Sequence, residues 1–156
     1  MYAYVLAKWN TSIDFVFVQF YESFSHAAYQ ISQVGQSPSD FLIGYCNTLV
    51  RSGEEMFVSF EDDPTVQLQN QFVPFPLSKL VFGFANGWAL NDDIGEKTIF
   101  FPASSIKKAY QELAATGKEP RGAGFWVVEE EGAHGVNYAK DLKSILGGDK
   151  SVMEER

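Results

Sequence analysis

The chain has 156 residues, 46% of them hydrophobic and 15% aromatic, which predicts one folded domain with a sizeable core and excludes a disordered chain. Its formal net charge is −8 at pH 7, which argues against a nucleic-acid-binding protein, because phosphate contacts need a basic surface. A single cysteine, Cys46, excludes an internal disulfide framework, and the distant His26 and His134 give no metal-site spacing, so no metal or cofactor is expected.

The N-terminal segment MYAYVLAKWN is predicted to be a short amphipathic helix. Tyr2, Val5, Leu6 and Trp9 recur at the spacing of one helical face. The segment lacks the basic leader and small-residue cleavage site of a signal peptide, and the sequence assigns no location. No run approaches the ~20 apolar residues of a membrane span, so none is expected.

A nearly continuous apolar run over residues 14–21 predicts a strand of a parallel sheet that is covered on both faces. Residues 23–34 are predicted to be partly helical. Ser39 and Asp40 are then expected to cap a helix that runs to about Arg51.

The middle of the chain predicts a short strand over residues 56–60 and an acidic turn over 61–64. Residues 65–78 contain Pro74 and Pro76, which predict a loop or a sheet edge because proline cannot donate to a strand ladder.

The C-terminal half predicts two more strands and two helices. The apolar segments 80–88 and 122–128 read as buried strands, and the helical patterns cover residues 102–116 and 136–146.

Strands that alternate with helices predict right-handed crossovers and a parallel sheet, and therefore an α/β fold. We expect one domain over residues 1–146, followed by a polar tail over 147–156 that is frayed.

Each of the three long apolar strands ends in polar and aromatic side chains. In a parallel α/β sheet, ligands bind outside the carboxyl ends of the strands. Indole rings stack on the apolar face of a sugar, and amides or phenols bind its hydroxyl and acetamido groups, so this edge suits a sugar. The alternative is that Tyr21 and Trp126 are ordinary core aromatics. The strand ends carry Gln19 and Tyr21, then Asn86 and Trp88, then Trp126 near Glu129.

Three segments resemble the last three strands of the glycoside hydrolase family 18 barrel. DFVFVQFYE resembles the sixth strand, whose chitinases often have D-x-V-x-V-Q-x-Y-N; KLVFGFANGW resembles the seventh; PRGAGFWVVEEEG resembles the eighth, which carries a tryptophan. The segments fall in the family's order and the resemblance covers nearly all of residues 10–146. It implies a partial (β/α)8 TIM barrel, about the last three strand–helix units, with parallel strands.

The resemblance also implies roles for individual residues. Trp126 matches the tryptophan that forms the floor of the subsite for the reacting N-acetylglucosamine. Tyr21 matches the tyrosine that hydrogen-bonds the acetamido carbonyl, and Gln19 matches a glutamine that faces the same pocket. With Asn86, these form the predicted substrate-binding set for chitin or N-acetylglucosamine oligomers. Glu22 stands where the family often has Asn, and strand alternation points it away from the pocket.

The catalytic motif of that family, D-x-x-D-x-D-x-E, occurs nowhere in this sequence. The acidic runs at 61–63 and at Asp92, Asp93 and Glu96 lack its spacing and are expected to be solvated turns. No catalytic residue is therefore predicted, and the chain alone is expected to be inactive.

Three functions stay open: part of a chitinase-like hydrolase, a non-catalytic carbohydrate-binding remnant, or a scaffold without a sugar function. A barrel cut at this point leaves an open sheet edge near Val16 and Val18, which predicts self-association.

Overall fold

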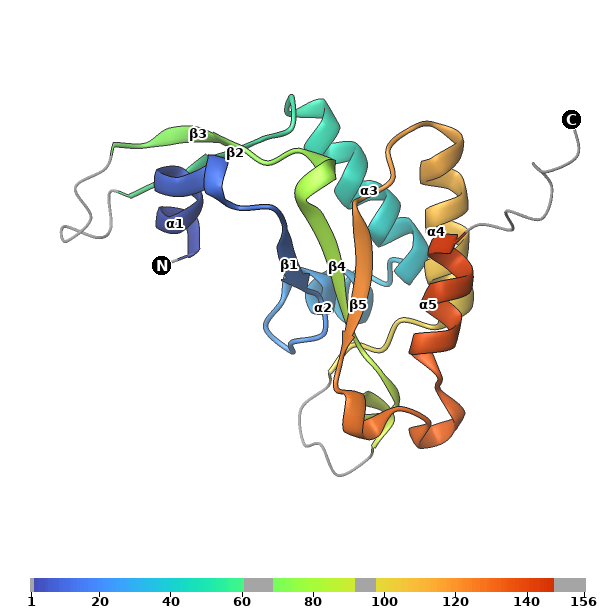
Figure 1. Ribbon diagram of the computed structural model, residues 1–156. Coiled ribbons are helices and arrows are strands. Elements are labelled where there is room, and N and C mark those ends of the chain that lie inside the picture. The colour runs from blue at the N-terminus through green and yellow to red at the C-terminus, as the bar shows by residue number, and fades with distance from the viewer. Residues whose placement is uncertain (1, 61–68, 92–97, 148–156) are drawn as a thin grey trace, which may run out of the picture.

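The computed structural model describes residues 2–60, 69–91 and 98–147. Figure 1 shows the arrangement of their helices and strands. In chain order these are α1 (Tyr2–Trp9), β1 (Val16–Gln19), α2 (His26–Ala28), α3 (Pro38–Arg51), β2 (Glu55–Val58), β3 (Gln71–Pro74), β4 (Leu80–Ala85), α4 (Ala103–Ala115), β5 (Gly122–Trp126) and α5 (Tyr138–Gly147). Short 3-10 or π turns connect them: η1 (Asn10–Ser12), η2 (Tyr29–Gln33), η3 (Leu77–Lys79), η4 (Gly87–Leu90), η5 (Val128–Glu130) and η6 (Ala133–Gly135).

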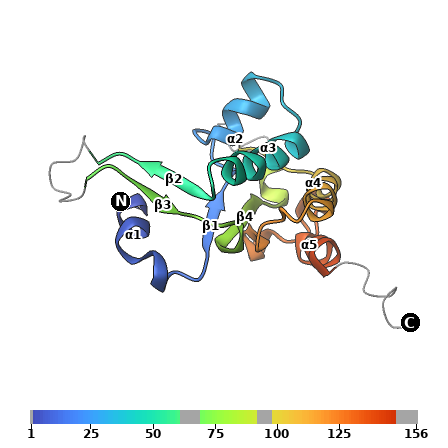
Figure 2. The same cartoon turned by 90° about the horizontal axis from the view of Figure 1, so that it is seen from above.

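The three long apolar segments form one parallel sheet in the order β1-β4-β5. Helices α3, α4 and α5 lie on one side of this sheet (Figures 1 and 2). This confirms the predicted α/β fold with parallel strands in sequence order. The sheet has three strands, which is compatible with a partial barrel and does not by itself establish one.

The main core lies between the sheet and its helices. Phe82 and Phe84 of β4 are fully buried there, and Leu42 of α3 and Ile106 of α4 pack in the same cluster. Burying side chains of this size contributes about 1.5–3 kcal/mol each. The hydroxyl of Tyr138, at the start of α5, donates to the Phe101 carbonyl, so the one polar atom of this buried ring is satisfied.

The prediction that all three strands are covered on both faces is wrong for the two outer strands. β4 is buried along most of its length, but β5 is only half-buried and Phe17 of β1 is 37% exposed. Val16 and Val18 face the core, whereas Phe15 and Phe17 lie on the opposite face. An apolar run thus marked the strand correctly, although only one of its faces has a helix layer.

A second, smaller core holds a hairpin that the sequence did not predict in full. β2 and β3 pair antiparallel, and Leu6 of α1 packs against Val58 and Val73 on one face of this hairpin. Residues 71–74 were expected to be a loop or an edge. They form an edge strand, in which Pro74 pairs with Glu55 at the end of the ladder. Figure 1 shows the hairpin and α1 extending away from the three-stranded sheet.

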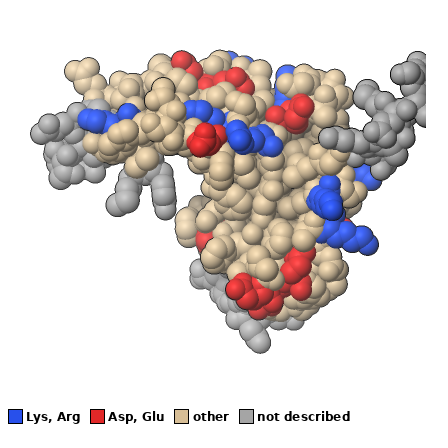
Figure 3. Space-filling model, viewed as in Figure 1, with Lys and Arg blue, Asp and Glu red and all other residues tan. Residues whose placement is uncertain are grey.

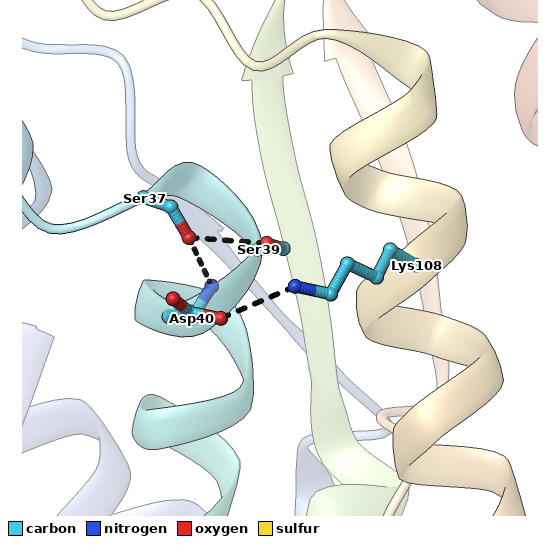
Figure 4. Close-up of polar contacts among 4 residues, drawn as sticks. All are labelled: Ser37, Ser39, Asp40 and Lys108. Atoms are coloured by element: carbon cyan, nitrogen blue, oxygen red, sulfur yellow. Dashed lines mark hydrogen bonds and ion pairs between the residues drawn. The ribbon is translucent and has the colours of Figure 1, made fainter.

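Helix α3 begins earlier than predicted. Its N-cap is Ser37, whose Oγ accepts a hydrogen bond from the Asp40 backbone N at 3.2 Å, with Pro38 in the first turn. Ser39 and Asp40 therefore lie inside the helix, and Ser37 Oγ also lies 3.1 Å from Ser39 Oγ (Figure 4). A hydrogen bond between the Ser37 side chain and the Asp40 carboxylate lowers the pKa of that carboxyl, and Lys108 of α4 lowers it further across a 3.6 Å ion pair.

Charge is unevenly distributed on the face seen in Figure 3. Acidic side chains gather at the lower end, where Figure 1 places the turns that follow β4 and β5, and the middle of this face is uncharged. The acidic runs at 61–63 and 92–96, and residues 148–156 of the expected tail, lie outside the described residues. Within the described ranges, no helix is long and apolar enough to cross a membrane.

Candidate functional site

The candidate site lies at the carboxyl ends of β1, β4 and β5. Gln19 pairs with Gly83, Gly83 pairs with Gly124, and Ala85 pairs with Trp126 in the parallel register. Since paired residues of a sheet share a face, the side chains of Gln19 and Trp126 lie on the same face, the one without helices. The structure thus brings two of the four predicted site residues onto one surface.

Two glycines make this open face shallow enough for an aromatic ring to lie across it. A Cβ atom on Gly83 would lie 2.2 Å from Phe17 Cε1, and one on Gly124 would lie 2.8 Å from Phe17 Cε2. Phe17 therefore lies across the backbone of β4 and reaches that of β5. The result is a flat apolar surface next to Gln19, suited to the C–H face of a ring-shaped ligand.

Trp126 is the most accessible member of the predicted set. Its side chain is 58% exposed at the end of β5. Its backbone is held firmly, because its carbonyl accepts from the Trp88 indole Nε1 at 2.5 Å and from the Asn86 backbone N at 3.2 Å. An exposed indole on a fixed strand end is available for stacking with a ligand.

Tyr21 lies just beyond β1 and is only 4% exposed. Its ring meets the Trp88 ring edge-on, with 6.0 Å between centroids, and its carbonyl accepts a hydrogen bond from the Ile99 backbone N at 3.1 Å. Burial, and then the charge of Glu22, raise the pKa of Tyr21. Its hydroxyl therefore stays protonated at neutral pH and can donate a hydrogen bond.

Asn86 is fully buried, and its amide holds the strand ends together. Its Nδ2 donates to the Val127 carbonyl at 2.8 Å and to Glu131 Oε2 at 3.3 Å, while its Oδ1 accepts from the Val127 N at 3.2 Å. Glu131 Oε1 in turn accepts from the Ala139 N at 2.6 Å, in the first turn of α5. A direct contact between Asn86 and a sugar stays a prediction, and no part of its side chain is exposed to make one.

A close approach of two turns fixes the position of Trp88. A Cβ on Gly87 of η4 would lie 2.0 Å from the Ala133 carbonyl oxygen in η6. Only glycine allows this distance, so the η4 turn that carries Trp88 is pressed against the loop that follows β5.

The described part of the chain offers no set of three or more His, Cys, Asp or Glu side chains that could hold a metal ion. Near the site, Glu129 is exposed, whereas Glu131 is engaged with Asn86 and Ala139. The arrangement can therefore stack and hydrogen-bond a ligand, and it provides no carboxylate pair of evident catalytic geometry among the described residues.

No protein-family model and no curated protein matches this chain.

The structure gives roles to two further residues that shape the site. Trp88 links the Tyr21 ring to the Trp126 backbone, and Glu131 links Asn86 to the start of α5. The sequence predicted Trp88 at the strand ends as an indole that suits a sugar, and its supporting contacts were not predicted; Glu131 was missed. Glu131 sits in an acidic run with Glu129 and Glu130, and nothing in its spacing distinguishes it from them.

Proposed function

We propose that this chain is the C-terminal part of a chitinase-like barrel that binds N-acetylglucosamine oligomers without hydrolysing them. Three parallel strands in the expected order, with helices on one side, are compatible with the last strand–helix units of such a barrel. The open face of the sheet, without helices, corresponds in this proposal to the inside of the barrel. The order of the three resembling segments supports the same parentage.

The single observation that carries the proposal is the exposed Trp126 indole beside the surface made by Phe17 and Gln19. Gly83 and Gly124 leave that surface flat. A pyranose would stack its apolar face on Trp126, while the Gln19 amide and the Tyr21 hydroxyl would hydrogen-bond its polar substituents. Among the described residues the Gln19 side chain makes no hydrogen bond, so its amide is free for a ligand.

The proposal includes the absence of turnover by this chain alone. In family 18 the acetamido oxygen of the sugar attacks the anomeric carbon while a glutamic acid protonates the leaving oxygen. The motif that supplies this acid is missing from the sequence. General acid catalysis contributes about 10²–10⁴-fold, and the remaining barrel walls that would orient the acetamido group lie outside these three strands.

The test is a calorimetric titration, in which the binding of an N-acetylglucosamine tetramer to the purified chain is measured. We expect Trp126→Ala to weaken binding roughly 30-fold, which corresponds to about 2 kcal/mol for a dominant tryptophan contact. Trp9→Ala is the matched control, because Trp9 is also about half-exposed but lies on α1, away from the strand ends. The chain should release no product from a fluorogenic oligomer.

Failure of the wild-type chain to bind, or an equal loss in Trp9→Ala, would refute the proposal. Turnover abolished by Trp126→Ala would also contradict it and would make Glu129 the first acid to mutate.

A scaffold without a sugar function is the second candidate, and the burial of Tyr21 favours it. An ordinary core aromatic is expected to be buried, as Tyr21 is. Tyr21→Phe separates the two candidates. It should weaken oligomer binding if the hydroxyl contacts the sugar. It should leave the free energy of unfolding nearly unchanged, since no residue in the described ranges forms a hydrogen bond with that hydroxyl.

A further inference from the structure

A groove along helix α3 lies outside the proposed sugar site. It has a volume of about 550 Å³ and lies on the helix layer, whereas Trp126 and Gln19 lie on the opposite face of the sheet. One wall is a single stripe of α3 at positions i, i+3, i+4, i+7, i+8 and i+11. That stripe consists of Phe41, Gly44, Tyr45, Thr48, Leu49 and the C-cap Ser52.

The stripe has rows of large and small side chains, as helix-packing surfaces do. Phe41, Tyr45 and Leu49 form one row four residues apart, and the small residues Gly44 and Thr48 lie beside them in a parallel row. Phe41 and Leu49 are buried and form the floor of the groove, whereas Gly44 and Tyr45 are half-buried and Thr48 is exposed. The small residues leave a depression beside the larger ones, and a depression of this kind suits the ridge of a second helix. The other walls come from the segment before α3 and from Glu55 and Met56 of β2.

The groove marks the place of a missing neighbour in a regular layer. α4 packs between α3 and α5, so α4 has a helix on each flank. α3 has α4 on one flank only, and Figure 2 shows α2 and β2, not a long helix, on its other side. Met56, which lines the groove, and Val16 of β1 both pack against each of the two cores, which places the groove in the same region as the first strand.

The edge of the sheet nearest to this groove, strand β1, has no further strand paired with it among the described residues. β1 and β5 are its two outer strands, and in the described residues no strand lies beyond either of them. Half of the backbone N–H and C=O groups of each outer strand therefore face away from the sheet, which makes each edge a template for a further strand. All three strands are parallel. A second copy's β5 can therefore pair with β1 in the parallel direction, and the extended sheet stays parallel throughout.

We infer that the α3 groove and the β1 edge together receive a second copy of this chain, which contributes its β5 edge and its helix α5. This head-to-tail contact extends both the sheet and the helix layer. The added strand and helix run in the same direction as those already present. The chemistry agrees: α5 has exposed Leu146 for the apolar stripe, and exposed Lys140 and Lys143, whereas Glu55 is the one carboxylate among the groove-lining residues. The two patches differ, so the contact is heterologous and one copy can use both at once.

The net charge of −8 on each copy opposes this contact. At physiological salt the Debye length is about 8 Å, so repulsion between distant surface charges is screened while the contact itself is not. Association is therefore expected to strengthen as salt is raised from low to physiological concentration.

The experiment is sedimentation velocity of the purified chain at about 1–100 µM, the range in which exposed edges associate. Thr48→Arg blocks the groove, and Leu146→Glu blocks the helix that enters it; both positions are exposed, so circular dichroism should stay unchanged. Gln111→Arg, on the exposed side of α4, is the matched control. We expect the wild type and the control to associate, and each blocking variant to weaken association by about 10-fold or more, since an unpaired charge costs at least 1.4 kcal/mol at a contact.

Mixing the two blocking variants decides the geometry. Thr48→Arg keeps its α5 face, and Leu146→Glu keeps its groove, so an equal mixture should form dimers and nothing larger. A wild type that stays monomeric throughout, a control that dissociates like the blocked variants, or a mixture that stays monomeric would each overturn the inference. These readouts do not involve sugar, so they are independent of the proposed binding function.

Discussion

Replacing Gly87 with alanine tests the close packing of the two turns beside the candidate site. The added Cβ would lie 2.0 Å from the Ala133 carbonyl oxygen and 2.6 Å from its carbonyl carbon. Both are backbone atoms, so a change of side-chain rotamer cannot relieve the clash, and the turns must move apart. Overpacking of this kind typically costs about 1–3 kcal/mol of the free energy of unfolding.

For a chain of this size, each kcal/mol lowers the midpoint of thermal unfolding by about 2–4 °C. Urea unfolding followed by circular dichroism measures the loss directly. Gly122→Ala is the control, because a Cβ on Gly122 of β5 would meet no atom within 4 Å. If Gly87→Ala and Gly122→Ala unfold at the same urea concentration, the turns do not pack as described and the reasoning fails.

Two further predictions concern α3. Burial raises the pKa of the Cys46 thiol from 9.0 to about 12. The unfolded thiol ionises first as the pH rises, so this site's contribution to stability is full below pH 9.0 and is lost progressively between pH 9.0 and about 12; unfolding in urea at several pH values checks this against Cys46→Ala, and native Cys46 should resist thiol reagents at pH 8. Ser37→Ala removes the N-cap and should lower the free energy of unfolding by about 1 kcal/mol, whereas Ser144→Ala on the exposed side of α5 should not; equal effects would contradict the cap assignment.

The order and direction of the main strands could be predicted from the sequence, because long apolar runs separated by helical patterns leave few other topologies. The burial of each face could not. Phe15 and Phe17 are as apolar as Val16 and Val18, and only the absence of a layer over the open face exposes them. The sequence left β3 open between a loop and a sheet edge for a local reason: Pro74 argues against a central strand, and here it ends a two-stranded ladder.

Only part of the site could be predicted, namely which side chains share a face of a strand, because the two-residue period of a strand decides this. Strand alternation lets the faces of β1 be told apart from the sequence, and a tryptophan at the end of the third strand was an evident candidate for a ligand surface; that the face of Gln19 is the open one follows from the structure. The contacts of Trp88 depend on how η4 meets the end of β5, which is a tertiary property. The same is true of the buried amide of Asn86, whose partners lie 41 and 45 residues away along the chain.

The hydrogen bonds of Asn86 have a consequence for hydrogen exchange and for ligand entropy. The Val127 amide follows an exposed tryptophan, yet its proton is held by a fully buried side chain, so it should exchange with solvent as slowly as amides inside β4. A surface that is already ordered loses little conformational freedom when a ligand arrives. If the proposed ligand binds at these strand ends, its affinity would then be governed by the quality of the contacts that Trp126 and Gln19 make.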